Sequence, residues 1–223
     1  METMIALALS VVVTSAMVIL MANSLGTATR IIHMSQLTDE MRNAVSMMTR
    51  DVRRANHTAN SIFCYGNSDC GAVGGVAQQA GDIQIVSLAA NRDCFSYTLD
   101  RNFDGNAAND PVGAFRLVPS ANNAGVIEMW TGAAGATPNC GSAAGTNGWI
   151  ELTDPATVNI TLLDVDDAAS FSKEIFEDET NSFDNRQRQI QIRIQGELVN
   201  DTTGIVSRSI EDIIYVRNDF ILL

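Results

Sequence analysis

A single acid, Glu2, stands in front of 27 consecutive uncharged residues, from Thr3 to Thr29. As a helix this segment is about 40 Å long, which exceeds the roughly 30 Å hydrocarbon core of a bilayer. It is too long for the apolar core of a signal peptide. We therefore predict a retained membrane segment at the start of the chain.

The helical pattern continues beyond Arg30 but becomes amphipathic. Apolar residues recur there at intervals of three or four: Met34, Leu37, Met41, Val45, Met48 and Val52. This is the period of a helix that buries one face, and Asn56, His57 and Thr58 are typical of its end. We predict one helix of about 50–55 residues, or about 80 Å. Residues 1–57 would form this helix, whose second half would pack beneath a disulfide-bonded, β-rich globular head of residues 58–223.

The head changes to the two-residue period of β-strands. Strands are predicted at 82–89, 94–99, 114–118, 126–130, 149–152, 158–165, 190–194 and 210–216. Residues 102–113 and 132–148 are predicted to be surface loops, and the acidic stretch 164–184 a solvated loop with little fixed structure. One helix packed on an antiparallel sheet is an α+β fold.

The charge of the chain is unevenly divided. The whole chain has 26 acids and 14 bases, a net charge of −12. Residues 1–57 carry +1 and residues 58–223 carry −13. Because nucleic-acid contact needs clustered cations, we expect no specific nucleic acid as a partner. Arg50, Arg53 and Arg54 suit the C-terminal end of a helix and could pair with the acidic head.

The first residues carry a family resemblance. The stretch E-T-M-I-A-L resembles the N-terminal segment of type IV pilins and of the pseudopilins of type II secretion. Glu2 matches the glutamate of that family, and the hydrophobic stretch behind it is matched by Thr3, Met4, Ile5, Ala6 and Leu7. The family carries a basic leader before this point. We therefore expect that Met1 is an internal methionine or that the sequence is truncated, and that the mature N-terminus lies a few residues upstream.

The resemblance implies a pilin fold and two successive locations, first the membrane and then a filament. A prepilin peptidase would process the chain, which would wait in the bacterial inner membrane. Pilus or secretion machinery would then assemble it into an extracellular filament, a polymer of the chain itself. The ending IIYVRNDFILL, residues 213–223, is similar to the last strand of PilW-type minor pilins.

Glu2 needs an explanation in its own right, because a charge that faces lipid costs up to about 2.5–3.5 kcal/mol at the bilayer centre. The resemblance implies that its carboxylate pairs with the N-terminal amine of a neighbouring subunit and so sets the axial register of each subunit. The alternative is an acid solvated at the level of the lipid headgroups.

All four cysteines lie beyond the apolar segment, at Cys64, Cys70, Cys94 and Cys140. An even number in a head that follows a membrane segment indicates disulfides formed in an oxidising compartment. Three pairings are possible. We favour Cys64–Cys70 and Cys94–Cys140, each stabilising the fold by about 2–4 kcal/mol.

One loop resembles the first half of a calcium-binding loop. Its oxygen-bearing side chains follow the pattern D-x-N-x-D-G and are, with a possible closing acid, Asp100, Asn102, Asp104, Asn106 and Asp110. Alternating oxygen ligands at this spacing can converge on Ca²⁺. The alternative is a turn rich in Asp and Asn. No other cofactor is expected.

The sequence does not favour an enzyme. Both histidines, His33 and His57, fall on the predicted helix, away from the loops of the sheet, and nucleophile, phosphate-loop and metalloprotease motifs are absent. We expect a structural subunit of a type IV pilus-like filament. The alternatives are a minor pilin or pseudopilin that primes a filament, and a non-polymerising, membrane-anchored periplasmic binding domain.

Overall fold

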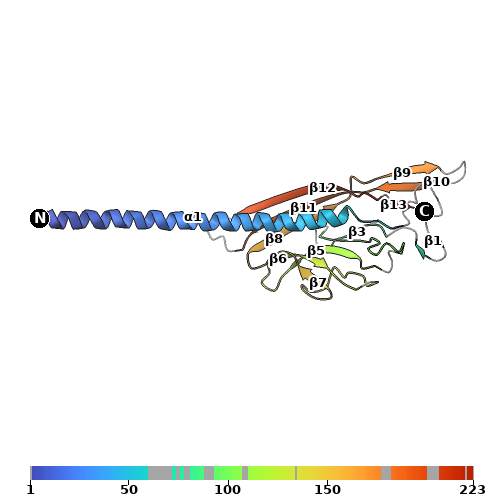
Figure 1. Cartoon of the computed structure of the whole chain (residues 1–223), viewed down its shortest axis with the longest axis horizontal. Helices are drawn as coiled ribbons and strands as arrows, with labels where there is room; N and C mark the ends of the chain where they lie inside the picture. The colour runs from blue at the N-terminus through green and yellow to red at the C-terminus, as the bar shows by residue number, and fades with distance from the viewer. Residues whose placement is uncertain are drawn as a thin grey trace.

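The protein consists of one long helix that runs into a β-rich head (Figure 1). The computed structural model describes residues 2–59, 72–73, 76–77, 81–87, 93–106, 110–133, 135–176, 182–199, 206–218 and 220–222. The helix is α1 (Glu2–Val52). The strands are β1 (Ala72–Val73), β2 (Val76–Ala77), β3 (Gln84–Val86), β4 (Cys94–Tyr97), β5 (Gly113–Pro119), β6 (Gly125–Trp130), β7 (Trp149–Glu151), β8 (Val158–Asp166), β9 (Phe171–Phe176), β10 (Ser182–Gln187), β11 (Gln189–Leu198), β12 (Ser207–Tyr215) and β13 (Phe220–Leu222). The predicted α+β fold is confirmed.

The helix has 51 residues, which confirms the length predicted from its periodicity. Five of the six predicted apolar positions are buried in the head, together with Ala44 and Thr49; they are Leu37, Met41, Val45, Met48 and Val52. Met34 is half-buried, so contact with the head begins there. The division of the helix into a free half and a packed half follows the change of pattern near Arg30.

The end of α1 is capped by a left-handed residue and by the chain that follows β12. Asn56 has φ of 63°, a conformation that Asn tolerates better than most residues and that often ends a helix. The amide of Arg217 donates to the Arg53 carbonyl at 3.4 Å. The side chain of Asn218 donates to the Ala55 carbonyl at 2.9 Å. The last turn is therefore held by a segment far away in the sequence.

Two antiparallel sheets enclose the packed half of the helix. One has the strand order β12-β11-β8 and the other β3-β4-β5-β6-β7. All eight predicted strands are present in these two sheets. The sheets adjoin where β6 meets β8: the Gly125 amide donates to Oδ1 of Asn159 at 2.7 Å. A Cβ on Gly125 would lie 1.9 Å from the Ile160 carbonyl oxygen, so only glycine allows this approach.

The main core lies between α1 and the inner faces of both sheets. Isoleucines at alternate positions of β11 line it, namely Ile190, Ile192 and Ile194. Aromatic rings of β4 and β5 continue it, with Phe95 and Phe115 stacked at 5.5 Å. Tyr97 also ties the helix to β4, because its hydroxyl donates to Oδ2 of Asp51 at 2.8 Å. Burial, and then the charge and hydrogen bond of Asp51, raise the pKa of Tyr97 far above its usual value.

The prediction of a loop over residues 164–184 is wrong. β8 extends to Asp166, β9 and β10 pair as an antiparallel hairpin, and β13 adds to the other side of β10. The described side chains of β9 are mostly exposed, so the hairpin has no clear apolar alternation for sequence reasoning to detect. Its strands are held instead by backbone hydrogen bonds, which acidic side chains do not prevent.

A buried arginine joins this hairpin to the larger sheet. Arg188 makes a bidentate contact with Asp82, with Nε–Oδ1 at 3.0 Å and Nη2–Oδ2 at 2.6 Å, and it also contacts Asp167. Asp82 precedes β3, and Asp167 follows β8. The guanidinium therefore connects three segments that are distant in sequence, with the geometry in which Arg binds carboxylates best.

Candidate functional site

The free half of α1 is the most unusual surface of the molecule. Every residue from Glu2 to His33 is exposed, and the large apolar side chains here are 53–79% exposed. Among the described residues this is the one helix long and apolar enough to cross a membrane, and its apolar window has no buried part. Water does not favour so much exposed apolar surface, so this segment fits a membrane anchor.

Polar side chains in this half are satisfied within the helix. The hydroxyls of Ser10 and Thr14 donate to the carbonyls of Leu7 and Ser10 at 2.9 and 2.8 Å. Ser15, Thr27 and Thr29 donate to backbone carbonyls in the same way. Because these hydroxyls need no water, they do not prevent the segment from entering lipid or a bundle of helices.

The six residues predicted for subunit assembly occupy the first two turns of α1. They are Glu2, Thr3, Met4, Ile5, Ala6 and Leu7, and all are exposed at the end of the helix far from the head. Glu2 lies in the first turn, where a carboxylate is favoured by the helix dipole. The structure brings these residues together at one tip and leaves their role in assembly a prediction.

A disulfide joins Cys94 of β4 to Cys140, the long-range pairing favoured from the sequence. It closes a sequence separation of 46 residues. Cys64 and Cys70 lie outside the described residues. The bond fastens the segment that follows β6 to the face of the larger sheet opposite α1, where Ala114, Trp130 and Trp149 form a second core.

The same face contains a fully buried ion pair. Arg116 of β5 donates from Nε and Nη2 to Oε2 of Glu128 at 2.8 and 2.6 Å, and neither side chain is exposed. Nη1 of Arg116 donates to the carbonyls of Cys140 and Ser142 at 2.8 and 2.7 Å. The guanidinium also lies 4.2 Å from the ring centre of Trp149. Each charge is thereby compensated, as a buried charge requires.

This cluster orders the loop that was predicted only as a surface loop, residues 132–148. Besides the contacts of Arg116, the amide of Gly145 donates to Oε1 of Glu128 at 2.6 Å. Sequence reasoning did not identify the pair. A signal was available, because Arg116 and Glu128 occupy positions in two predicted strands that point to the same face, directly opposite one another. Opposite charges there predict a cross-strand pair.

The residues predicted to bind calcium form a tight turn around Asp100. The Asp100 carboxylate is buried and accepts the amides of Ala59 and Gly105, each at 2.9 Å. Asn102 Oδ1 accepts the amide of Asp104 at 3.0 Å, and Asp110 Oδ2 accepts that of Arg101 at 2.8 Å. Asp104 Oδ1 likewise accepts the amide of Asn106 at 2.7 Å. These oxygens act as caps of the turn.

The described residues contain no group of three or more His, Cys, Asp or Glu that could hold a metal ion. A role for calcium in this loop therefore stays a prediction. Burial acts to raise the pKa of Asp100, but the amides of Ala59, Gly105, Phe103 and Asp104 outweigh it and hold the pKa below its usual value. The ionised carboxylate thus stabilises the turn.

The placement of His57 on the helix was wrong. It lies beyond the end of α1, and its ring packs edge-on against Phe103 of the Asp100 turn, with ring centres 5.6 Å apart. Phe103 has φ of 61°, in the left-handed region. His33 does lie on the exposed part of α1. The expectation that the chain is not an enzyme remains a prediction.

The architecture defines a pilin-like protein: a long N-terminal helix, apolar and exposed in its first half, whose second half packs on antiparallel sheets. A model of the family described as prepilin peptidase-dependent protein B matches residues 30–216. The chain belongs to this family. The match begins after the segment that resembles pilins, so the head and the N-terminus point to the same class independently. The likeness to PilW-type minor pilins stays a prediction. Neither the curated proteins nor the solved structures gave a match.

Proposed function

We propose that this chain is a structural subunit of a type IV pilus-like extracellular filament, assembled through the first half of α1. The observation that carries the proposal is the exposed, largely apolar surface from Glu2 to His33, which is not buried against the head. Such a surface needs either lipid or other apolar helices. A subunit that waits in the inner membrane and then joins a filament satisfies the need in both stages.

The composition of this segment suits close packing of helices. Small residues recur along it, including Ala6, Ala8, Ala16, Ala22 and Gly26. In an apolar medium, helices associate through close van der Waals packing, which small residues allow. When the helix moves from lipid into a bundle of helices, its apolar surface stays out of water, so the hydrophobic free energy hardly changes. Close packing and the pairing of Glu2 then favour the bundle over the membrane. Prepilin peptidase and the pilus or secretion machinery are the partners that this role requires.

Two other roles share the same architecture. A minor pilin or a type II secretion pseudopilin would prime a filament and be present in only a few copies. A non-polymerising anchor would use the apolar helix only to hold a periplasmic binding domain at the membrane. The three roles differ in the abundance of the chain in filaments and in the need for Glu2.

The test is electron microscopy of material sheared from cells, with the subunits identified by mass spectrometry, for wild type, Glu2→Ala and Glu151→Ala. Glu151→Ala is the matched control, because it removes the same charge from an exposed position of the head. We expect filaments composed chiefly of this chain, lost in Glu2→Ala and kept in Glu151→Ala. Filaments with only traces of the chain would indicate the priming role. A chain absent from filaments, with Glu2→Ala unaffected, would indicate the anchor and refute the proposal.

A further inference from the structure

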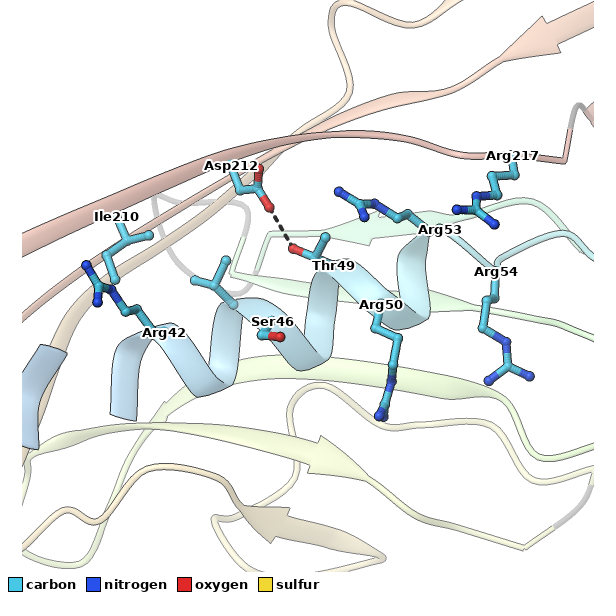
Figure 2. A pocket seen from close by; sticks show the side chains of 10 residues that line it. Arg42, Ser46, Thr49, Arg50, Arg53, Arg54, Ile210, Asp212 and Arg217 are labelled. Atoms are coloured by element: carbon cyan, nitrogen blue, oxygen red, sulfur yellow. Dashed lines mark hydrogen bonds between the residues drawn. The ribbon is translucent and has the colours of Figure 1, made fainter. Parts of the chain in front are cut away.

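An arginine-lined groove lies between the last turns of α1 and strand β12 (Figure 2). Its volume is about 590 Å³. We call it the arginine groove after the five arginines that line it: Arg42, Arg50, Arg53, Arg54 and Arg217. They make up five of the 14 basic residues of a chain whose net charge is −12. So strong a concentration of one charge sign points to a binding surface.

Among the residues that the structure describes, one of these cations forms an ion pair. Arg50 contacts its neighbour Asp51 at 3.3 Å. The groove has one carboxylate in its lining, Asp212, whose Oδ2 accepts the hydroxyl of Thr49 at 2.9 Å. Within the described part of the chain, the side chains of the other four arginines form no ion pair. The expectation that the arginines at the helix end pair with the acidic head is therefore not met there for Arg53 and Arg54.

The helix dipole explains only part of this arrangement. Cations are favoured in the last turn of a helix, which accounts for Arg50, Arg53 and Arg54. Arg42 lies more than two turns earlier, and Arg217 belongs to a different segment, after β12. In Figure 2, Arg53 and Arg217 extend into the same space between the helix and β12, whereas Arg50 and Arg54 extend to the other side of the helix. Two segments thus contribute charge to one surface.

The opposite flank of the same helix carries an acid, Glu40. Helical geometry places Glu40 and Arg42 about 100° to either side of the buried Met41. Glu40 lies against the connection between β7 and β8, where its Oε2 accepts the amide of Asp154 at 3.0 Å and its Oε1 accepts the hydroxyl of Thr157 at 3.2 Å, which leaves other lone pairs of the carboxylate for a partner. The side chain of Asp154 is exposed. We call Glu40 and Asp154 the acidic flank.

We propose that the arginine groove binds the acidic flank of a second copy of this chain. Arginines bind carboxylates with bidentate, charge-assisted hydrogen bonds, and complementary charge fixes the register of an interface. The two surfaces are different patches, so the contact is head-to-tail and can repeat without closing into a dimer. Glu40 lies about 20 Å from Arg53 along the helix axis, so parallel copies staggered by about that distance bring the two surfaces together.

This inference rests on the proposed function, in that it supplies a contact between the heads of assembling subunits. A nucleic acid is the other anionic occupant with a regular spacing of charges. It is disfavoured because it would bring many closely spaced phosphates to a chain whose net charge is −12, whereas the acidic flank brings two carboxylates. A second copy carries the same net charge, so long-range repulsion opposes this contact as well, and close pairing with the arginines must outweigh it.

The test compares self-association of the full-length chain in detergent micelles by sedimentation. The groove variant is Arg53→Glu with Arg217→Glu, and the flank variant is Glu40→Lys with Asp154→Lys. The control for the groove variant is Lys173→Glu with Arg193→Glu, which makes the same change of charge on other surfaces. If the flank variant does not fold, Glu40→Gln with Asp154→Asn removes the charges and keeps acceptor oxygens.

We expect each charge-reversed variant alone to self-associate at least about tenfold more weakly than wild type, because like charges then face each other. An equimolar mixture of the two reversed variants should recover association, since each offers the surface that the other needs. The neutral flank variant should also self-associate more weakly than wild type, but it should not restore association when mixed with the groove variant. Raising the salt from about 0.1 M to about 1 M should weaken wild type, because the Debye length falls from about 10 Å to about 3 Å.

A groove variant that associates like wild type overturns the inference, as does a wild-type chain that stays monomeric. Binding of a fluorescent single-stranded oligonucleotide that the groove variant loses, with self-association unchanged, would assign the groove to nucleic acid instead. The proposed function fails separately: it depends on Glu2 and on the presence of the chain in filaments. If association through α1 is insensitive to salt and filaments are lost in Glu2→Ala, the proposed function is supported and only the proposed contact of the arginine groove is refuted.

Discussion

Replacing Arg116 by methionine is predicted to be among the most damaging single changes in the head. The variant would leave the fully buried carboxylate of Glu128 with the amide of Gly145 as its remaining donor among the described contacts. Removing one partner of a buried ion pair costs about 3–5 kcal/mol. The carbonyls of Cys140 and Ser142 also lose a donor, and each unsatisfied group adds about 1–3 kcal/mol if it stays buried. We expect a loss of at least about 4 kcal/mol, a large part of the usual stability of a domain.

A double-mutant cycle separates the ion pair from the packing. Glu128→Gln removes the charge of the partner but keeps an acceptor for the Gly145 amide. If the two charges depend on each other, Arg116→Met combined with Glu128→Gln should cost less than the sum of the single changes, by about 1–3 kcal/mol. The orphaned loop carbonyls should keep the double variant less stable than wild type.

The assay is urea unfolding of the full chain in detergent micelles, followed by tryptophan fluorescence. The two tryptophans of the chain, Trp130 and Trp149, both lie in the second core of the head, and the Trp149 ring packs against Arg116. Because α1 has no tryptophan, the signal reports on the head. A cost below about 1 kcal/mol for Arg116→Met would refute the reasoning, and so would a double variant whose cost is strictly additive.

Three further changes test other parts of the structure. Asp100→Asn should lower the free energy of unfolding by about 1–3 kcal/mol at about pH 7. Because folding lowers the pKa of Asp100, its stabilisation is present above the unfolded value of about 3.9 and is lost as the pH falls through the folded value, so urea unfolding at about pH 3 should show a smaller difference. Gly125→Ala should cost more than about 2 kcal/mol in thermal unfolding followed by circular dichroism, because a Cβ meets the Ile160 carbonyl at 1.9 Å. Cys94→Ala with Cys140→Ala should cost about 4 kcal/mol in urea, the loop-closure value for a separation of 46 residues.

Controls make these outcomes specific. Gly141→Ala is the control for Gly125, since its Cβ would lie 3.6 Å from Oδ1 of Asn139, an ordinary contact; we expect a change within about 0.5 kcal/mol. An equal loss in both glycine variants would contradict the backbone clash. A pH-independent difference for Asp100→Asn would show that the charge of this carboxylate does not matter. A double cysteine variant as stable as wild type would mean that the loop is held by Arg116 alone.

The features that depend on local periodicity could be predicted from the sequence. Local patterns predict the length of α1, the change of character near Arg30 and the eight strands of the two sheets that enclose the helix. These patterns repeat every three to four residues in the helix and every two residues in the strands. The end of α1 near Asn56 follows from the preference of Asn for a left-handed conformation. Each of these signals lies within a few residues of the feature that it predicts, so no knowledge of distant contacts is needed.

Other features required the tertiary structure, because they join residues far apart in the chain. The β9–β10 hairpin was taken for a loop, since its strands are held by backbone pairing and lack an alternating apolar face. His57 was placed on the helix, although the chain turns just before it and packs it on Phe103. The order of strands and the adjoining of β6 and β8 likewise depend on contacts between distant segments.

The difference between features that the sequence predicts and features that only the tertiary structure sets is clearest for the charged residues. The sequence by itself determined that Glu2 stands alone before a membrane-length helix and that the head is acidic. Only the tertiary structure decided which charges are buried as a pair, Arg116 with Glu128, and which gather in the arginine groove. The physical reason is that the energy of a charge depends on burial and on its nearest partners, and both are set by how distant segments pack.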